Sequence, residues 1–204
     1  MKRLLLALLP LIPVPHRLLH GLLVADNKAE NEANGWARLR DPSELGRYGV
    51  INAYLQEFAP GGAVLDVGCA DGILQERIAY GSYLGIDMFA ESIARAQAKA
   101  DARTRFLCAD AATFIPEERF DAIVWNECLY YLAEPIDVIT RYRDYLRPNG
   151  VMIVSMLDQT FATRSLFRQL HVLGEVRANV RLVAPNGVAW VVRAYDASLT
   201  SDAR

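Results

Sequence analysis

The most constraining feature of the sequence is an apolar run that contains an acid and ends in a glycine-containing turn. Residues 64–72 read Val-Leu-Asp-Val-Gly-Cys-Ala-Asp-Gly, and Ile73 to Ala79 is typical of the start of a helix. A short apolar run bounded by glycine predicts a buried parallel strand. Glycine lets the backbone approach a ligand closely, and a helix start offers unpaired N–H groups. The segment therefore predicts a strand, a turn and a helix, with a ligand at the turn.

The charges beside this turn distinguish two kinds of ligand. The loop reads Gly68-x-Ala70-x-Gly72, whereas dinucleotide-binding folds grip a pyrophosphate with the pattern G-x-G-x-x-G. Asp66 lies within the strand and Asp71 within the turn. Two acids favour a ligand that carries an ammonium group over one that carries a diphosphate, because opposite charges attract. Asp71 on its own is interpreted as a cap of the following helix.

Four further segments follow the first in a defined order. Residues 83–87 form a second apolar run that ends in Asp87, nineteen residues after Gly68, where an acid can accept the hydroxyls of a ribose. Three more segments follow in order, at residues 105–111, 120–127 and 146–154. The five segments together resemble the class I S-adenosylmethionine-dependent methyltransferases.

The resemblance implies S-adenosylmethionine as the cofactor, with S-adenosylhomocysteine as its product. The glycine loop would lie along the cofactor, with Asp66 near its amino-acid end. Asp87 would accept the two ribose hydroxyls, and Asp110 the adenine amino group, with help from the Ala111 N–H. The implied cofactor-binding residues are Tyr48, Asp66, Gly68, Ala70, Gly72, Asp87, Met88, Asp110, Ala111 and Asn126.

Strands and helices alternate after the first motif, which is the pattern of a doubly wound parallel sheet. Helices are expected at residues 91–102, 135–146 and 160–174. Asn186-Gly187, between two apolar runs, predicts an antiparallel hairpin. With the resemblance, the expected fold is α/β and Rossmann-like: a mostly parallel, seven-stranded sheet with a C-terminal antiparallel hairpin. Such a hairpin separates these methyltransferases from ordinary dinucleotide-binding folds.

Length and composition limit the organisation of the chain. The 204 residues suffice for one domain with a substantial core, and the 52% apolar and 23% charged residues are typical of a globular protein. The net charge of −2 predicts no general attraction to nucleic acid. We expect an N-terminal apolar helix and linker at residues 1–40, the methyltransferase domain at 41–197 and a tail at 198–204.

The cysteines do not have the spacing of a metal site. Cys69, Cys108 and Cys128 form no C-x-x-C pair and have no histidine nearby in sequence. Each follows the end of an expected strand. We therefore expect no metal and interpret the three as reduced thiols near the site, as in a cytosolic protein.

The first residues allow two interpretations. A basic start precedes the apolar run 4–15, as in a secretory signal peptide, but three prolines interrupt it and no clear cleavage site follows. The run is also too short to span a bilayer. Residues 1–24 could pack on the domain as a helix or lie on a membrane surface. We favour the surface anchor, because residues 18–23 place leucines on one helical face. The expected location is cytoplasmic, at the inner face of the membrane if the anchor binds.

The segment before the first motif contains one isolated aromatic residue and a helix start. Trp36 is interpreted either as packing at a domain edge or as a lid over the substrate. Asp41 to Glu44 predicts a helix start with Pro42 early and Ser43 as its cap. In the family, a helix at this place packs over the methionine end of the cofactor, and Tyr48 is the expected contact.

The acceptor side is expected at residues 125–132. Glu127 and Cys128 stand where nucleobase amino-methyltransferases have prolines, and Cys128 does not follow a proline as in cytosine-C5 enzymes. Neither nucleic-acid chemistry fits. The stretch resembles the nodulation S-like group, whose named member N-methylates the amino-sugar end of a chitooligosaccharide. The implied catalytic residues are Glu127, which would accept a proton from an amine or hydroxyl or orient it, and Tyr130 and Tyr131, either of which would stack on the acceptor or donate a hydrogen bond near it.

The sequence thus predicts direct in-line transfer of a methyl group to an amine or hydroxyl of a small-molecule or glycan acceptor. A membrane anchor would make a lipid-linked or amphipathic acceptor attractive. Arg164 and Arg168 could meet an acidic acceptor or form a solvated helix face. Two alternatives stay open: a nicotinamide-dependent oxidoreductase, and a non-catalytic cofactor-binding subunit of a complex. The oligomeric state is not predicted.

Overall fold

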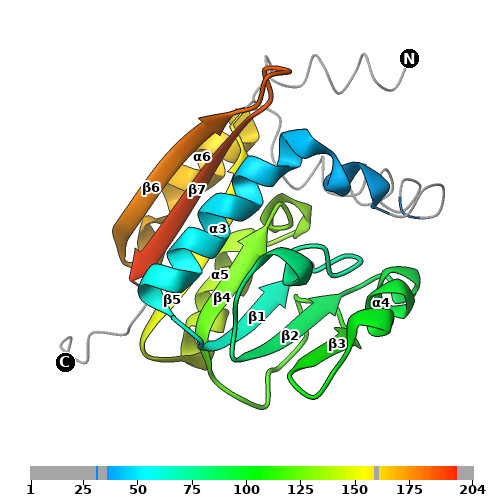
Figure 1. Cartoon of the computed structure of the whole chain (residues 1–204). Coiled ribbons are helices and arrows are strands. Elements are labelled where there is room, and N and C mark those ends of the chain that lie inside the picture. The colour runs from blue at the N-terminus through cyan, green and yellow to red at the C-terminus, as the bar shows by residue number, and fades with distance from the viewer. Residues whose placement is uncertain (1–30, 32–35, 159–160, 197–204) are drawn as a thin grey trace, which may run out of the picture.

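One seven-stranded sheet forms the centre of the protein (Figure 1). The computed structural model describes residues 31, 36–158 and 161–196. The strand order is β3-β2-β1-β4-β5-β7-β6; neighbours among β1 to β5 pair in parallel, and β7 pairs antiparallel with β5 and β6. The expected fold, including the hairpin, is confirmed. The strands are β1 (Ala63–Val67), β2 (Ser82–Asp87), β3 (Thr104–Cys108), β4 (Phe120–Asn126), β5 (Leu146–Leu157), β6 (Glu175–Val183) and β7 (Ala189–Asp196).

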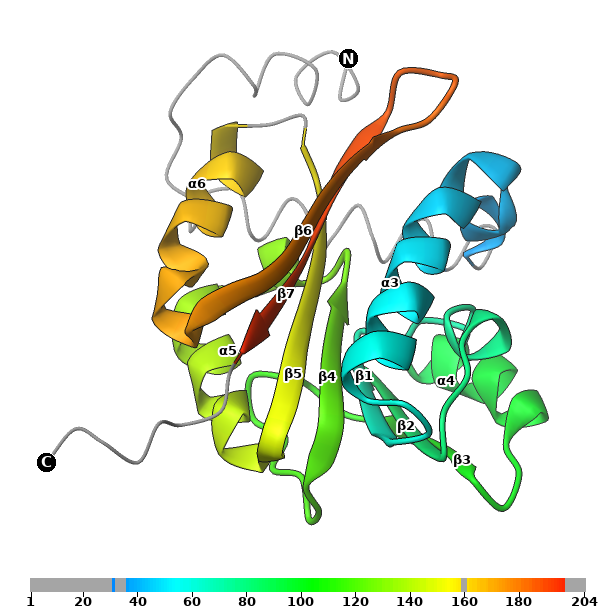
Figure 2. The same cartoon turned by 60° about the vertical axis from the view of Figure 1, so that its left-hand side comes forward.

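Helices cover both faces of this sheet, as Figure 2 shows. The side chains of α3 and α4 pack in one hydrophobic core, and those of α5 and α6 pack in another on the opposite face. Alternate residues of a strand point to opposite faces, so Val64 joins the first core and Leu65 the second. These helices are α3 (Leu45–Phe58), α4 (Ala90–Ala96), α5 (Pro135–Tyr142) and α6 (Phe161–Gln169).

The central strand β1 contains the one feature that packing alone does not explain. All five of its residues are buried, as expected for a parallel strand covered on both faces. Four of them are apolar, but the fourth in order, Asp66, is a carboxylate that is 1% exposed. Burying a charge in a core is costly without a partner. Asp66 therefore indicates a function near the carboxyl end of β1.

The turn after β1 differs from the sequence prediction. The helix expected from Ile73 to Ala79 is a turn followed by one 3₁₀ turn, Gln75–Arg77, after which Ile78 is extended (φ −122°, ψ 155°). Asp71 does not cap a helix; its carboxylate pairs with Arg95 of α4 at 2.9 Å. The glycine loop thus has no long helix behind it to bind a phosphate, which agrees with the acids beside it.

The other expected helices are present, with different ends. Asp41, rather than Ser43, is the cap of the first turn, because its side chain accepts the Ser43 N–H at 2.8 Å. The second crossover helix begins at Ala90 and its final 3₁₀ turn ends at Lys99, before the expected residue 102. The helix expected at 160–174 is α6 with a 3₁₀ turn, and Gly174 ends it at φ 124°.

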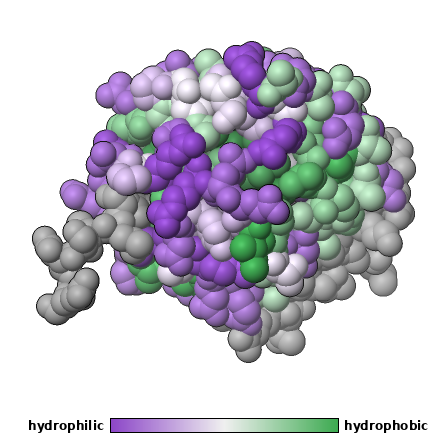
Figure 3. All heavy atoms as spheres, turned by 90° about the horizontal axis from the view of Figure 1, so that it is seen from below, coloured by the Kyte–Doolittle hydropathy of each residue, from purple (hydrophilic) through white to green (hydrophobic). Residues whose placement is uncertain are grey.

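Residues 1–30 and 197–204 lie outside the described residues, so the N-terminal predictions, including the membrane anchor, stay predictions. Within the described part, no helix is long and apolar enough to cross a bilayer. Figure 3 shows the face of the molecule at the amino ends of the parallel strands, where hydrophilic residues predominate. The carboxyl ends of these strands lie on the opposite side.

Two glycines provide a test of how the turn is packed. Gly72 has φ +71°, and a Cβ there would come within 2.8 Å of the Phe106 ring. Gly49, within α3, would place a Cβ in open space. We expect Gly72→Ala to lower the free energy of unfolding by about 1–3 kcal/mol, and Gly49→Ala to raise it by about 0.5–1 kcal/mol. Urea unfolding measures both. Equal effects of the two substitutions would contradict the packing described for Gly72.

Candidate functional site

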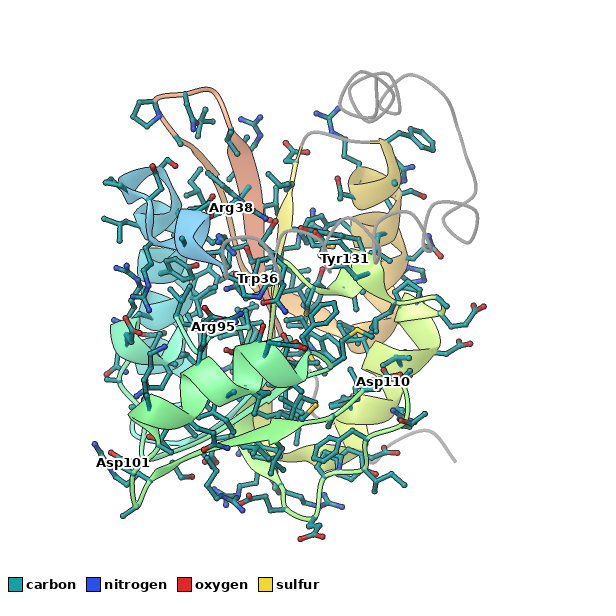
Figure 4. The ribbon with its side chains drawn as sticks, turned by 90° about the vertical axis from the view of Figure 1, so that its right-hand side faces the viewer. Trp36, Arg38, Arg95, Asp101, Asp110 and Tyr131 are labelled. Atoms are coloured by element: carbon teal, nitrogen blue, oxygen red, sulfur yellow. The ribbon has the colours of Figure 1, made fainter. Side chains whose placement is uncertain are left out.

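A cavity of about 350 Å³ opens at the carboxyl ends of β1, β2 and β4. Ligands of open parallel sheets bind where the strand order reverses, and β1 and β4 are the strands at that point here. Figure 4 shows Trp36 and Arg38 on one side of this region and Tyr131 and Asp110 on the other, with Asp101 at the distant end of the sheet. The cavity is therefore shared by the segment before α3 and the loops that follow the strands.

The structure brings together nearly all residues that the sequence predicted for the site. Gly72 is the exception: it does not line the cavity, and its missing side chain leaves room for Phe106. Gly68 does line it, with φ +74°, and a Cβ there would come within 2.5 Å of the Cys128 Cβ. The predicted residues that line the cavity are Tyr48, Asp66, Gly68, Ala70, Asp87, Met88, Asp110, Ala111, Asn126, Glu127, Tyr130 and Tyr131.

Asp66 offers an unsatisfied oxygen at the cavity. Its Oδ2 accepts a hydrogen bond from the Tyr83 hydroxyl at 2.5 Å, while Oδ1 is buried and has no partner among the described residues. Burial raises the pKa of Asp66 to about 7. A buried carboxylate oxygen without a partner is costly, and an ammonium group would satisfy it. This oxygen fits the amino group of the expected cofactor.

Asp87, at the end of β2, holds the glycine loop. One oxygen accepts the Ala70 N–H and the other accepts the Phe89 N–H, both at 2.9 Å. Burial raises the pKa of Asp87. Each carboxylate oxygen has a further lone pair, so the expected contact with ribose hydroxyls is compatible with these bonds. Asp87 thus shapes the loop and lines the cavity.

Asp110 and Ala111 follow β3 on the far side of the cavity. The Asp110 carboxylate is exposed and accepts the Ala112 N–H at 2.8 Å. The Ala111 carbonyl accepts hydrogen bonds from Arg141 at 2.9 Å and from the Tyr142 hydroxyl at 3.1 Å. These bonds fix the turn that would face the adenine. The adenine contact itself stays a prediction.

Arg47 is the main residue of the cavity that the sequence analysis did not select. It lies in α3, is 1% exposed and lines the cavity. Its Nη1 donates to Asn126 Oδ1 at 2.5 Å, and its Nη2 donates to Glu44 at 2.6 Å. The buried Nε has no partner among the described residues. A cation here fits the carboxylate of the expected cofactor, as the Asp66 oxygen fits its amino group.

A signal for Arg47 was present in the sequence. Buried positions of α3 are spaced four residues apart at Arg47, Ile51 and Leu55. The arginine therefore lies on the face of the helix that packs in the core. A charged residue at a core position indicates a function more strongly than one on a surface. Its neighbour Tyr48, which the sequence analysis did select, lies 4.7 Å below the Arg47 guanidinium and donates to the Leu39 carbonyl at 3.2 Å.

Glu127 lies just past β4 in a backbone conformation that side chains rarely adopt, with φ 60°. Its Oε2 accepts the Tyr130 hydroxyl at 2.9 Å, and its Oε1 accepts the Ser155 hydroxyl at 3.4 Å. Burial raises the pKa of Glu127 to about 7, although the positive charge of Arg47 opposes this shift. Strained backbone of this kind concentrates at functional sites. The Tyr130 and Tyr131 rings lie 4.5 Å apart beside it.

The three cysteines are free, and two of them lie at the cavity. The Cys128 thiol donates to the Val67 carbonyl at 2.9 Å. Burial raises the pKa of both Cys69 and Cys128, so neither is a ready nucleophile. Cys108 is exposed and does not line the cavity, contrary to the prediction that all three lie near the site. Within the described ranges, no group of three or more His, Cys, Asp and Glu side chains could hold a metal ion.

Trp36 packs at the edge of the domain, as the first of the two interpretations has it, while its role as a lid over the substrate stays a prediction. It is 7% exposed, its indole N–H donates to the Ser92 hydroxyl of α4 at 3.0 Å, and it also lines the cavity. The two arginines considered for an acidic acceptor lie elsewhere. Arg164 pairs with Asp158 at 2.9 Å, and Arg168 stacks on Phe161. Neither lines the cavity, so they are interpreted as part of a solvated helix face.

The model of the methyltransferase domain family matches residues 38–201, and the chain belongs to this family. A ubiquinone biosynthesis O-methyltransferase of Histophilus somni is 34% identical over 129 residues, which cover 55% of this chain and 53% of that protein. An uncharacterized methyltransferase of Mycobacterium tuberculosis is 36% identical over 121 residues, covering 56% and 59%. The chain thus spans about half the length of the curated relatives it matches.

Two solved structures show the same fold. The N-methyltransferase NodS of Bradyrhizobium japonicum, in complex with S-adenosylhomocysteine, has a TM-score of 0.71 at 22% identity over 83% of this chain and 95% of that one. The 1,6-didemethyltoxoflavin-N1-methyltransferase of Burkholderia thailandensis has a TM-score of 0.70 at 19% identity, covering 92% of each chain. The class is therefore the S-adenosylmethionine-dependent methyltransferases of class I, and the nicotinamide alternative is set aside. Membership of the nodulation S-like group stays a prediction.

S-Adenosylmethionine is the cofactor of this class, and the residues present fit it. The orphaned Asp66 oxygen and the Arg47 guanidinium offer opposite charges to the two ends of an amino acid. The loop from Gly68 to Ala70 brings backbone against the cavity, and Asp87 lies at its edge. These residues would hold the cofactor.

The pKa of Asp66 predicts a pH dependence of cofactor binding. The ammonium group of S-adenosylmethionine is attracted only by the ionised carboxylate of Asp66. Because the pKa of Asp66 lies at about 7, this carboxylate becomes protonated as the pH falls below 7. We expect the affinity for S-adenosylmethionine to fall by about tenfold per pH unit at most, between pH 8 and pH 6. Calorimetry of the wild type and Asp66→Asn checks this. The variant should bind weakly with a flat profile; a variant that retains the wild-type slope would contradict the assignment.

Asp87 allows a second binding test with a matched control. Asp87→Ala removes both the anchor of the glycine loop and the expected ribose contact. We expect the affinity for S-adenosylhomocysteine to fall by about tenfold or more, the usual effect of losing hydrogen bonds to a charged group. Asp101→Ala, at the distant end of the sheet, should bind as the wild type does (Figure 4). Equal affinities of the Asp87 and Asp101 variants would contradict the predicted role.

Proposed function

We propose that this protein transfers a methyl group from S-adenosylmethionine directly to a hydroxyl or an amine of a small-molecule acceptor, and that Glu127 accepts the proton that is released. The observation that carries the proposal is Glu127 itself. It is a partly buried carboxylate with a pKa of about 7, held in strained backbone just past the carboxyl end of β4, on the wall of the cofactor cavity. A general base works best with a pKa near the working pH.

The cofactor supplies a methyl group that is already activated by its sulfonium. The protein therefore has to position the acceptor and receive a proton, and positioning can contribute about 7–11 kcal/mol at best. Tyr130 and Ser155 each donate to one oxygen of Glu127 and fix its plane. The acceptor oxygen or nitrogen would form the new bond to the methyl carbon while the carbon–sulfur bond breaks, its electron pair staying on sulfur to give S-adenosylhomocysteine. The acceptor's proton would pass to the Glu127 carboxylate. No covalent intermediate with the protein is needed.

The cavity walls favour a small acceptor with apolar surface. The cavity that Glu127 lines is also lined by Trp36, Tyr131, Leu157 and Trp190. Aromatic walls of this kind bind flat, weakly polar molecules. A hydroxyl acceptor receives support from the relative named as a ubiquinone biosynthesis O-methyltransferase. An amine acceptor receives support from the similarity to the N-methyltransferase NodS.

Three wider expectations stay proposals beside this one. They are a cytoplasmic location, contact with a membrane surface through residues 1–24, and a lipid-linked or amphipathic acceptor that such contact would favour. A non-catalytic cofactor-binding subunit is the remaining alternative. Turnover by the purified chain separates that alternative from an enzyme.

The experiment is an acceptor screen that measures S-adenosylhomocysteine formation with panels of phenols, aliphatic alcohols and amino sugars. We expect kcat with the best acceptor to rise with pH through about 7, because Glu127 must be ionised. Glu127→Gln should lower kcat by about 10²-fold or more, the usual contribution of a general base, and should remove this rise. The affinity for S-adenosylmethionine should change little.

Glu118→Gln is the matched control, because Glu118 pairs with Arg105 on the surface and does not line the cavity. It should behave as the wild type in rate and pH profile. Full activity of Glu127→Gln would refute the role of Glu127, and absence of turnover with every acceptor would favour the subunit alternative.

A further inference from the structure

The buried guanidinium of Arg47 joins the first helix of the domain to the end of β4. It donates to Asn126 Oδ1 at 2.5 Å and to Glu44 at 2.6 Å, and it lies 4.7 Å over the Tyr48 ring and 5.8 Å over the Trp190 ring. These groups belong to α3, the turn before it, β4 and β7. Arg47 thus has a fixed place between four separate parts of the chain.

The bond to Asn126 determines how that amide is oriented. Its oxygen accepts from Arg47, so the two N–H donors of the same amide point away from the guanidinium. Asn126 lines the cavity and directly precedes Glu127. Arg47 therefore also limits how the backbone at Glu127 can turn.

We propose that Arg47 is a positioning residue of the methyl-transfer site: it fixes the side chain of Asn126 and holds the Glu127 carboxylate in its charged, proton-accepting form. This inference rests on the proposed role of Glu127.

The groups that face Glu127 make Arg47 the dominant cation. From α3 and the turn before it come Arg47 and Glu44, from the loop after β4 comes Tyr130, and from β5 comes the neutral Ser155. Arg47 and the two hydroxyls favour the carboxylate, whereas Glu44 and burial oppose it. Glu44 is itself paired with Arg47, so the two act together on Glu127.

A guanidinium suits this position better than an ammonium. Its planar fork donates to Asn126 and Glu44 at once, and its charge is retained when buried. A lysine would keep the charge but could not keep both bonds in the same plane. The lysine variant therefore separates the effect of charge from the effect of orientation.

The test reads the protonation of Glu127 directly and needs no acceptor. The full-length, cofactor-free protein is labelled with ¹³C at the glutamate carboxyl groups, and the Glu127 signal is assigned by its absence from Glu127→Gln. The chemical shift of this signal is followed as the pH is varied, and its midpoint gives the pKa of Glu127. In the wild type this midpoint should lie at about pH 7. In Arg47→Met it should rise by about one pKa unit or more, because an opposite charge has been removed. Arg47→Lys should recover most of that shift.

Two further variants complete the design. Glu44→Gln should move the midpoint downward, because a like charge has been removed. Arg147→Met is the matched control: Arg147 pairs with Asp121 near the opposite end of β4, so the midpoint should not move. Circular dichroism and thermal unfolding confirm that each variant is folded. If Arg47→Met does not fold, the lysine and Glu44 variants carry the test.

A midpoint that is unchanged in the folded Arg47 variants and in Glu44→Gln would overturn the inference. The midpoint and the turnover of Glu127→Gln are independent measurements, so the two proposals can fail separately. A shifted midpoint together with full activity of Glu127→Gln would leave Arg47 coupled to Glu127 but would refute the catalytic role on which the proposal rests.

Discussion

The attachment of the glycine loop to the end of β2 is the constraint on which the site depends. The N–H groups of Gly68 and Cys69 both donate to the Ile86 carbonyl at 2.9 Å, and Asp87 accepts the N–H of Ala70. These bonds turn the chain sharply at the end of β1, where only a residue without a side chain can lie against Cys128. The turn leaves room for the cavity. Because the groups that hold the turn belong to β2, the position of the cofactor site depends on the pairing of β1 with β2.

The site is maintained at a cost in stability. Asp66 is buried and Glu127 is partly buried, and loss of solvent raises the pKa of each to about 7, above the ordinary value of a carboxyl group. The native state therefore binds protons more tightly than the unfolded chain does. The stability that this provides is fully present below the ordinary pKa and is lost as the pH rises through about 7. The proposed roles of Asp66 in binding and of Glu127 in catalysis both require the charged form, which folding disfavours.

Local patterns account for the parts that the sequence predicted well. β1 and β4 are apolar because both of their faces are covered, and Asn186-Gly187 predicts the hairpin between β6 and β7 because its turn requires positive φ. The helix expected after Gly72 was wrong, because the tendency of seven residues to form a helix is weak. The end of the segment instead bonds to α3: Asn52 accepts the Ala79 N–H, and Gln56 donates to the Ala79 carbonyl. Arg47 stands in the buried stripe of α3, but its role was missed because the contact that brings it to the site, with Asn126, lies 79 positions away in sequence.

By itself the sequence determined the class of the fold, the acids that lie within β1, at the end of β2 and after β3, and the presence of Glu127 beyond β4. These features are local, since each depends on a strand and the residues that directly follow it. Only the tertiary structure decided which oxygen of Asp66 is left without a partner, that Gly72 packs against the core instead of the cavity, and that Arg47 reaches Asn126. Those outcomes depend on side chains from separate elements meeting in a buried space, where distance and desolvation, rather than spacing along the chain, set the chemistry.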